Sequence, residues 1–259
     1  MPIIAADRPS GVSRVVAGRR WNLVFGWTLA VLAIAAFANL GAWQLRRGAD
    51  KQAMLDAADR VLGERRALPL AAAADPDRTT RYDWAAGRGR FDPRDALLLD
   101  NQQRDGRNGV RAYRIFVPLQ GPPLLVELGW LPLEGTREMP VVERPAGTLE
   151  LRGLLTPPPS AGLALGNALV RDDGAWLMMR LETDAITRAA ELPVPLAPRV
   201  LRLDPALPLG FDRDLELLAN TLPPAKHRGY AVQWFGLALT VLVTALVLTF
   251  RRSSRSPSR

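Results

Sequence analysis

The chain has 259 residues and a formal net charge of +8, but most of that charge lies at its two ends. Residues 1–20 and 251–259 hold eight arginines and one aspartate, a net charge of +7, whereas the rest of the chain carries +1. This distribution argues against a nucleic-acid-binding protein, in which basic residues would gather on the folded domain. The chain also lacks cysteine, which excludes thiol catalysis, thiolate metal sites and covalent attachment of c-type haem.

Two long apolar segments near the ends of the chain predict membrane-spanning helices. Each holds about 20 residues, which as a helix cover roughly 30 Å, the thickness of a bilayer's hydrocarbon core. By the positive-inside rule, the basic tails face the cytoplasm, and the stretch between the segments faces the periplasm. We therefore expect a multi-pass protein of the bacterial inner membrane with both termini cytoplasmic. Its expected parts are a cytoplasmic tail, a transmembrane helix, a periplasmic domain, a second transmembrane helix and a second cytoplasmic tail, at residues 1–20, 21–43, 44–228, 229–250 and 251–259.

The first apolar segment has an alternative interpretation as a signal peptide. Ala36, Phe37 and Ala38 resemble a signal-peptidase site, and the preceding arginines resemble a basic n-region. The apolar stretch is long for a signal peptide, however, and Trp43 would anchor a helix at the membrane interface. We therefore expect an uncleaved anchor.

The stretch between the apolar segments has the sequence pattern of an α+β domain. Apolar residues recur at helical spacing over 45–66, and a second, shorter helix is expected at 182–192. Short apolar or alternating runs, separated by Gly and Pro, predict strands. These runs are residues 96–99, 113–117, 124–131, 149–155, 176–179 and 200–203. The expected fold class is a membrane protein in which two terminal transmembrane helices flank an α+β, mainly antiparallel-sheet extracytoplasmic domain.

Residue counts exclude several kinds of catalytic site. The only histidine is His227, and the only serine outside the tails is Ser160, in a proline-rich turn, so a serine triad is not expected. A zinc enzyme would need two or three His or Cys ligands, and the chain has one. A membrane-anchored hydrolase that uses paired carboxylates stays open, because aspartate and glutamate are plentiful.

The most informative residues lie at the start of the second apolar segment. If this stretch is helical, His227, Tyr230, Ala231 and Trp234 share one face. A neutral imidazole there can ligate a metal or porphyrin iron, neighbouring cations can meet propionates, and aromatic side chains can line an apolar ring. The alternative is an interfacial belt, because His, Tyr and Trp favour headgroup depth in any membrane protein.

Several basic residues depart from the positive-inside rule, because they lie on the expected outer side of the two segments. They are Arg46, Arg47, Lys51, Lys226 and Arg228. Their position fits either snorkelling of long side chains, which has no functional meaning, or a site for an anionic ligand.

The two membrane junctions resemble signatures of the Surfeit locus protein 1 family, which are assembly factors of cytochrome c oxidase. The first motif is Gly41-Ala42-Trp43-Gln44 with Arg47, and the second is His227-x-x-Tyr230-Ala231-x-Gln233-Trp234-Phe235. Shorter motifs between them fall in the family's order: Gly89-Arg90-Phe91, Asn101, Val117-Pro118-Leu119 and Gly129-Trp130-Leu131-Pro132. The family commonly has an arginine before the Gly-Trp pair, where this chain has Glu127-Leu128.

The resemblance implies a non-enzymatic assembly factor for aa3-type cytochrome c oxidase that binds haem a transiently and assists its insertion into the catalytic subunit. Carried over by position, His227 is the expected axial ligand of the haem iron, with Arg47, Lys226 and Arg228 as propionate partners. The other residues expected at this haem site are Trp43, Gln44, Tyr230, Gln233 and Trp234. We expect the two junctions to lie side by side, so that Trp43, Gln44 and Arg47 are close to His227, Tyr230 and Gln233.

The expected partners are the oxidase catalytic subunit, haem a synthase and membrane lipid, with no nucleic acid. Two alternatives to the haem chaperone stay open. One is a structural scaffold that holds an oxidase intermediate without touching haem, and the other is the carboxylate hydrolase.

Overall fold

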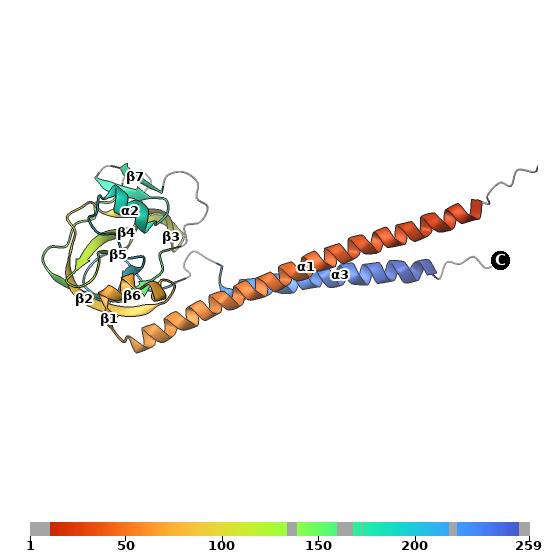
Figure 1. The fold of residues 1–259 in the computed structure, drawn as a ribbon, viewed down its shortest axis with the longest axis horizontal. Coiled ribbons are helices and arrows are strands. Elements are labelled where there is room, and N and C mark those ends of the chain that lie inside the picture. Colours follow the sequence, from red (N-terminus) through yellow and green to blue (C-terminus); the bar gives the residue numbers. More distant parts are fainter. Residues whose placement is uncertain (1–10, 134–138, 160–167, 173, 218–221, 254–259) are drawn as a thin grey trace, which may run out of the picture. The chain divides into compact units, whose positions relative to one another are not determined.

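The computed structural model describes residues 11–133, 139–159, 168–172, 174–217 and 222–253. Ser160 and the outer parts of both basic tails, residues 1–10 and 254–259, lie outside the described residues. The chain divides into two units, which Figure 1 draws as a helix pair and a sheet domain. The helical unit comprises Met1–Ala53 and Leu222–Arg259, and the sheet unit comprises Met54–Thr221.

The helical unit is formed by α1, Gly11–Glu64, and α3, Pro224–Ser253, and the last residues of α1, from Met54, are counted in the sheet unit. Within the described residues, Leu23–Glu64 and Pro224–Arg251 are long and apolar enough to cross a membrane. The helix expected at 45–66 is confirmed as the continuation of α1. This helix ends where Arg65 adopts a left-handed conformation with φ of 45°. Pro224 fits the first position of α3, because proline lacks only an N–H that is unpaired in any case.

The sheet unit contains nine strands in the described residues, and each expected run of apolar residues contributes to one of them. The strands are β1 (Leu68–Pro69), β2 (Asp83–Phe91), β3 (Leu97–Arg104), β4 (Arg107–Pro118), β5 (Leu124–Pro132), β6 (Leu149–Thr156), β7 (Leu169–Asp172), β8 (Ala175–Met178) and β9 (Val200–Leu203). The helical segments of this unit are the 3-10 helices Leu70–Ala74 and Pro76–Arg78 and the short helix α2, Thr183–Ala189. Helix α2 confirms the helix expected at 182–192.

The strands form one sheet in the order β1-β2-β6-β9-β5-β4-β3-β8-β7, with an extra pairing between β2 and β4. That extra pairing closes β2, β6, β9, β5 and β4 into a ring, from which β3, β8 and β7 extend (Figure 1). The sheet is mixed, and the expectation of a mainly antiparallel sheet was wrong: β1 with β2, β3 with β8 and β5 with β9 are parallel. Parallel neighbours need long connections, and both β8 and β9 come from far along the chain to pair with β3 and β5.

Two clusters of buried side chains lie on opposite faces of the strands. One contains Ala112, Phe116 and Val126, and the other contains Tyr113 and Leu125. Successive side chains of a strand point to opposite faces, so β4 and β5 supply both clusters. The second cluster includes Ile186 of α2, which packs on that face.

Gly89 explains how the ring closes between β2 and β4. A Cβ atom at this position would lie 2.3 Å from the carbonyl oxygen of Val117 and 2.6 Å from the ring of Phe116. Only glycine therefore permits the strands to approach this closely. The Gly89-Arg90-Phe91 motif thus has a structural role, since Phe91 and Phe116 also contact each other edge to face.

Candidate functional site

The helical unit is built on a seam in which side chains of α1 and α3 alternate at spacings of three and four residues. On α1 the seam is Trp27, Ala30, Phe37, Gly41, Gln44, Gly48 and Lys51. On α3 it includes Pro224, His227, Ala231, Trp234 and Ala238. This spacing is the heptad pattern of packed helices, and it keeps one stripe of each helix against the other.

His227 lies in this seam and is 6 % exposed. Its Nδ1 atom is 2.8 Å from Oε1 of Gln44. Because an amide oxygen only accepts, Nδ1 carries the proton and Nε2 presents a lone pair. Nε2 is buried and has no hydrogen-bond partner among the described residues. An imidazole held through one nitrogen, with the lone pair of the other free, is the arrangement that metal-ligating histidines have.

Close packing fixes this imidazole between the helices. A Cβ atom at Gly48 would lie 3.2 Å from Cβ of His227 and 3.4 Å from the carbonyl oxygen of Pro224. Lys51 donates a hydrogen bond of 2.7 Å from Nζ to the carbonyl oxygen of Leu222, which ties α1 to the start of α3. Glycine at position 48 therefore lets the helix backbones approach at the level of His227.

Aromatic side chains continue the seam along the apolar segments. The rings of Phe37 and Trp234 stack with centroids 5.7 Å apart. A Cβ atom at Gly41 would lie 2.8 Å from the ring of Phe235. Trp234 is thus packed between the helices, as an aromatic wall next to His227 would require, and Phe37 is a partner that the sequence reasoning missed.

The other residues expected at the site lie on the exposed faces of the helices. The side chains of Trp43, Tyr230 and Gln233 are exposed, and none of them forms a hydrogen bond with a described residue. Arg47 and Arg228 are also exposed. The expected proximity of the two junctions is confirmed for Gln44 and His227, whereas Tyr230 and Gln233 are exposed and form no contact with the described part of α1 that matches the expectation.

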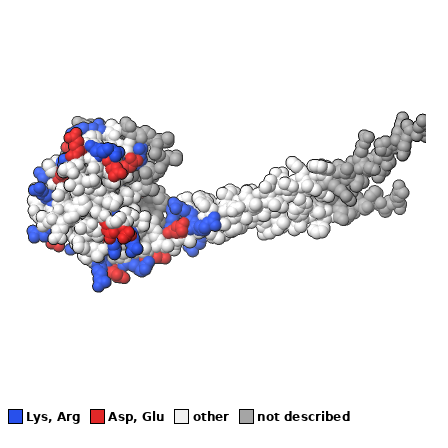
Figure 2. All heavy atoms as spheres, viewed as in Figure 1, with Lys and Arg blue, Asp and Glu red and all other residues white. Residues whose placement is uncertain are grey.

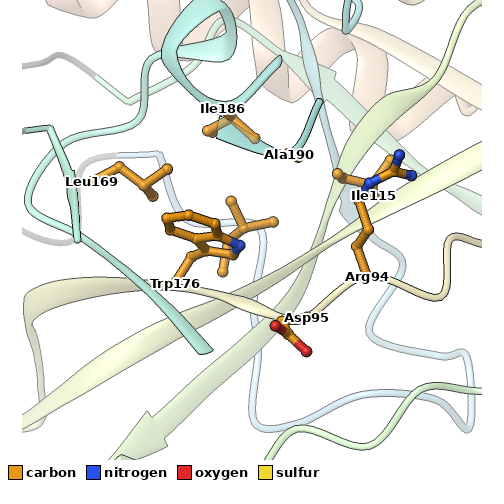
Figure 3. Close-up of a pocket in the computed structure, with 8 residues that line it drawn as sticks. Arg94, Asp95, Ile115, Leu169, Trp176, Ile186 and Ala190 are labelled. Atoms are coloured by element: carbon orange, nitrogen blue, oxygen red, sulfur yellow. The ribbon is translucent and has the colours of Figure 1, made fainter. Parts of the chain in front are cut away.

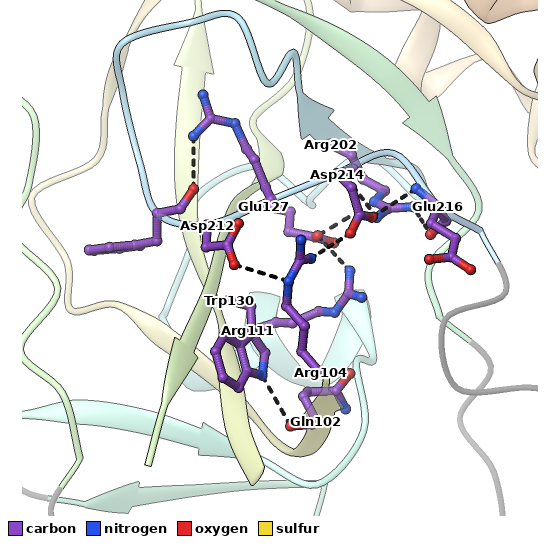
Figure 4. Close-up of polar contacts among 11 residues, drawn as sticks. Gln102, Arg104, Arg111, Glu127, Trp130, Arg202, Asp212, Asp214 and Glu216 are labelled. Carbon is purple, nitrogen blue, oxygen red and sulfur yellow. Dashed lines mark hydrogen bonds and ion pairs between the residues drawn. The ribbon is translucent and has the colours of Figure 1, made fainter. Parts of the chain in front are cut away.

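A second polar cluster, in the sheet unit, centres on Glu127 of β5. Its carboxylate is 2.7 Å from Nη1 of Arg111 and 3.4 Å from Nε of Arg202, and it accepts a hydrogen bond of 3.1 Å from the hydroxyl of Tyr113. Burial raises the pKa of Tyr113 well above its usual range, and the neighbouring Glu127 adds to this, so the hydroxyl stays a donor. Arg202 also donates to the carbonyl oxygen of Asp214 (Figure 4).

This cluster ties the segment after β9, residues 204–217, to the sheet, and we call these residues the return segment. Arg104 pairs with Asp212 and Asp214 of that segment (Figure 4). The Trp130 backbone N–H donates to the Asp212 carbonyl oxygen at 2.7 Å. Gly129 has a φ of 127°, and a Cβ atom there would lie 2.8 Å from the Phe211 carbonyl oxygen. Glu127, Gly129 and Trp130 thus hold the return segment, and Glu127 is neutralised by arginines and is not a free carboxylate.

A recess beside α2 does not provide a ligand site. It is lined by Leu97, Ile115, Trp176, Ile186 and neighbouring side chains, with Arg94 and Asp95 at its edge (Figure 3). It has no internal space for even a water molecule, so it is a packing gap. In the described part of the chain, no group of three or more His, Cys, Asp or Glu side chains could hold a metal ion.

Comparison with known proteins assigns the chain to a family. The model of the SURF1 family matches residues 31–239, a range that includes Gln44, His227 and the whole sheet unit. A search of curated proteins found no match. The family is associated with cytochrome oxidase assembly and is not a known enzyme family. Because the match covers most of the chain, the protein is a member of the SURF1 family.

Proposed function

We propose that the protein is a membrane-anchored assembly factor for an aa3-type cytochrome c oxidase that holds haem a through His227. The family supports the assembly role. The observation that carries the haem role is the buried, unpartnered Nε2 of His227, in an imidazole whose other nitrogen is bound to Gln44.

The residues of the seam fit a haem ligand. Haem a, when bound, would supply an iron that the lone pair of His227 Nε2 could hold. Gln44 fixes the ring orientation and leaves the lone pair on Nε2. Arg47, Lys226 and Arg228 are the cations that can pair with propionates. Since Nε2 is closed to solvent in the packed seam, binding requires local separation of the side chains that cover it.

The chain's single histidine favours a carrier over a permanent haem protein. One monomer cannot supply two imidazoles, so we expect a five-coordinate or weakly six-coordinate haem. The recipient subunit, with stronger ligation, can then withdraw the haem. The partners in this proposal are the oxidase catalytic subunit and haem a synthase, and the location is the bacterial inner membrane with a periplasmic sheet unit and cytoplasmic tails.

The absorbance spectrum of the purified protein tests this proposal. Protein from cells that make haem a should show a Soret band, His227→Ala should lose it, and Gln44→Ala should keep a weaker or shifted band because the ring is no longer oriented. Equal yield and equal thermal unfolding of the three proteins control for misfolding. A wild-type protein without a Soret band would favour the alternative, a structural scaffold that acts without haem.

A further inference from the structure

A collar of cations surrounds the seam at the level of His227. It comprises Arg46 and Arg47 of α1 and Lys226 and Arg228 of α3, and all four side chains are exposed. The Gln44–His227 hydrogen bond and the Gly48–Pro224 approach place these two stretches of helix at the same height along the pair. In the view of Figure 2, Lys and Arg gather beside acidic side chains at one end of the described part of the helix pair, and the described surface beyond them is white.

The cations of the collar lack protein partners. None of the four side chains forms a hydrogen bond or an ion pair with a residue that the structure describes, in contrast to the side chain of Lys51, which donates to the Leu222 carbonyl oxygen. The same stretches of helix carry one carboxylate, Asp50, and it is exposed and unpaired among the described residues. The collar therefore holds an excess of positive charge that nothing in the described protein neutralises.

The height of the collar matches the phosphate layer of a bilayer. At about 1.5 Å per residue, the four charged residues lie roughly 3–6 Å beyond Trp43 and Tyr230, the aromatic residues at the ends of the apolar segments. The headgroup layer extends about 5–8 Å beyond the hydrocarbon core. Guanidinium and ammonium groups at this depth meet lipid phosphates directly.

We propose that the collar binds the phosphate groups of anionic phospholipids in the leaflet at this end of the helix pair. The occupant is a phosphodiester lipid and not a free anion, because the four cations are exposed on the surface of the helices at the depth of the lipid phosphates. The inference rests on the helices crossing a membrane. The collar shares Arg47, Lys226 and Arg228 with the proposed haem site, whereas Arg46 belongs to the collar alone. Anionic lipid would offset the repulsion among the four cations near His227 and hold the seam at a defined depth in the bilayer.

Spin-labelled lipids test the proposal in the full-length protein reconstituted in phosphatidylcholine bilayers. The relative association constant of labelled phosphatidylglycerol should exceed that of labelled phosphatidylcholine severalfold. Arg46→Gln should lower this preference by up to about fivefold, since a cation near an anionic surface contributes about 1 kcal/mol. Arg46→Gln combined with Lys226→Gln should bring it close to unity.

The matched control is Arg88→Gln with Arg90→Gln, which removes two exposed charges from β2 and should leave the preference unchanged. Equal association of both lipids with the wild type, or an equal loss in the control, would overturn the proposal. So would displacement of the labelled lipid by inorganic phosphate beyond the effect of chloride at the same ionic strength, which would identify a free-anion site. The haem spectrum of Arg46→Gln reports separately on His227, so failure of one proposal can be told from failure of the other.

Discussion

Asp204 is the buried carboxylate that joins β9 to the return segment. It is 2 % exposed, and it accepts hydrogen bonds from Nε of Arg152 at 2.7 Å and from the Ala206 N–H at 3.0 Å. Burial alone would raise the pKa of Asp204, but these hydrogen bonds and the nearby arginines outweigh burial and hold the pKa below the usual value of 3.8. The ionised form is therefore the one that stabilises the folded sheet unit.

Acid should remove the stabilisation that Asp204 provides. With a folded pKa below 3.8, this contribution is fully present above pH 3.8 and is lost as the pH falls through the folded value. We expect Asp204→Asn to unfold more easily than the wild type at pH 7, and the difference in unfolding free energy to shrink at lower pH. Denaturant titrations of the full-length protein in detergent at several pH values measure this, and a pH-independent difference would contradict it.

At the residue scale, the sequence predicted the proximity of His227 and Gln44, because both lie at the boundary between apolar and polar residues. It did not predict that Tyr230 and Gln233 are exposed, since the helix face cannot be assigned without the partner helix. Spacings of three and four residues in the sequence indicate the seam, as between Gly41, Gln44, Gly48 and Lys51. The partners of Glu127 could not be predicted from the sequence, because strand pairing across long sequence distances brings Arg111 and Arg202 to it.

At the element scale, the packing of α1 against α3 can be tested by disulfide trapping in a chain without native cysteine. The Cβ positions of Gly48 and His227 are 3.2 Å apart, near the separation of about 3.8 Å in disulfides. The double variant Gly48→Cys/His227→Cys should therefore cross-link rapidly under mild oxidation, as gel mobility would show.

The matched control pair is Gln44→Cys/Gln233→Cys, in which Gln233 lies on an exposed face of α3. This pair should cross-link slowly or not at all. Equal rates for both pairs would mean that the seam is not the stable packing of the helices.

The strands show which part of a sheet can be predicted. Apolar runs located β3, β4, β5, β6, β8 and β9, because each strand buries at least one face. No strand was predicted at β1, which has two residues, or at β2 and β7, where charged residues and glycine interrupt the apolar runs. The sequence pattern also did not predict strand order and direction, because the parallel pairing of β5 with β9 depends on the ring closure and not on local periodicity.

At the scale of the whole molecule, the charge distribution predicts the orientation of the two helices in the membrane. Reporter fusions after Ala74 and after Arg259 should report opposite sides, with the first outside, because the tails carry +7 and the rest of the chain +1. Alkaline phosphatase and green fluorescent protein activities measure the two sides. If both fusions reported the same side of the membrane, or if the mature protein began at Asn39, the predicted hairpin would be contradicted.

In the proposed function, His227 is the residue that binds haem, and the sheet unit has a structural role. Deletion of the gene should lower aa3-type oxidase activity and affect quinol oxidases of other haem types less. A scaffold without haem contact would make the same prediction, so deletion alone does not separate the two functions.

The most direct measurement is the content of assembled aa3 oxidase in the membranes of a deletion strain that expresses either the wild type or His227→Ala at equal protein levels. Reduced-minus-oxidised spectra of the haem a band and oxidase activity both report assembly. The account predicts that the wild type restores the band and the activity, whereas His227→Ala restores little of either. Full restoration by His227→Ala would contradict the account, because it would make His227 a packing residue of the helix seam.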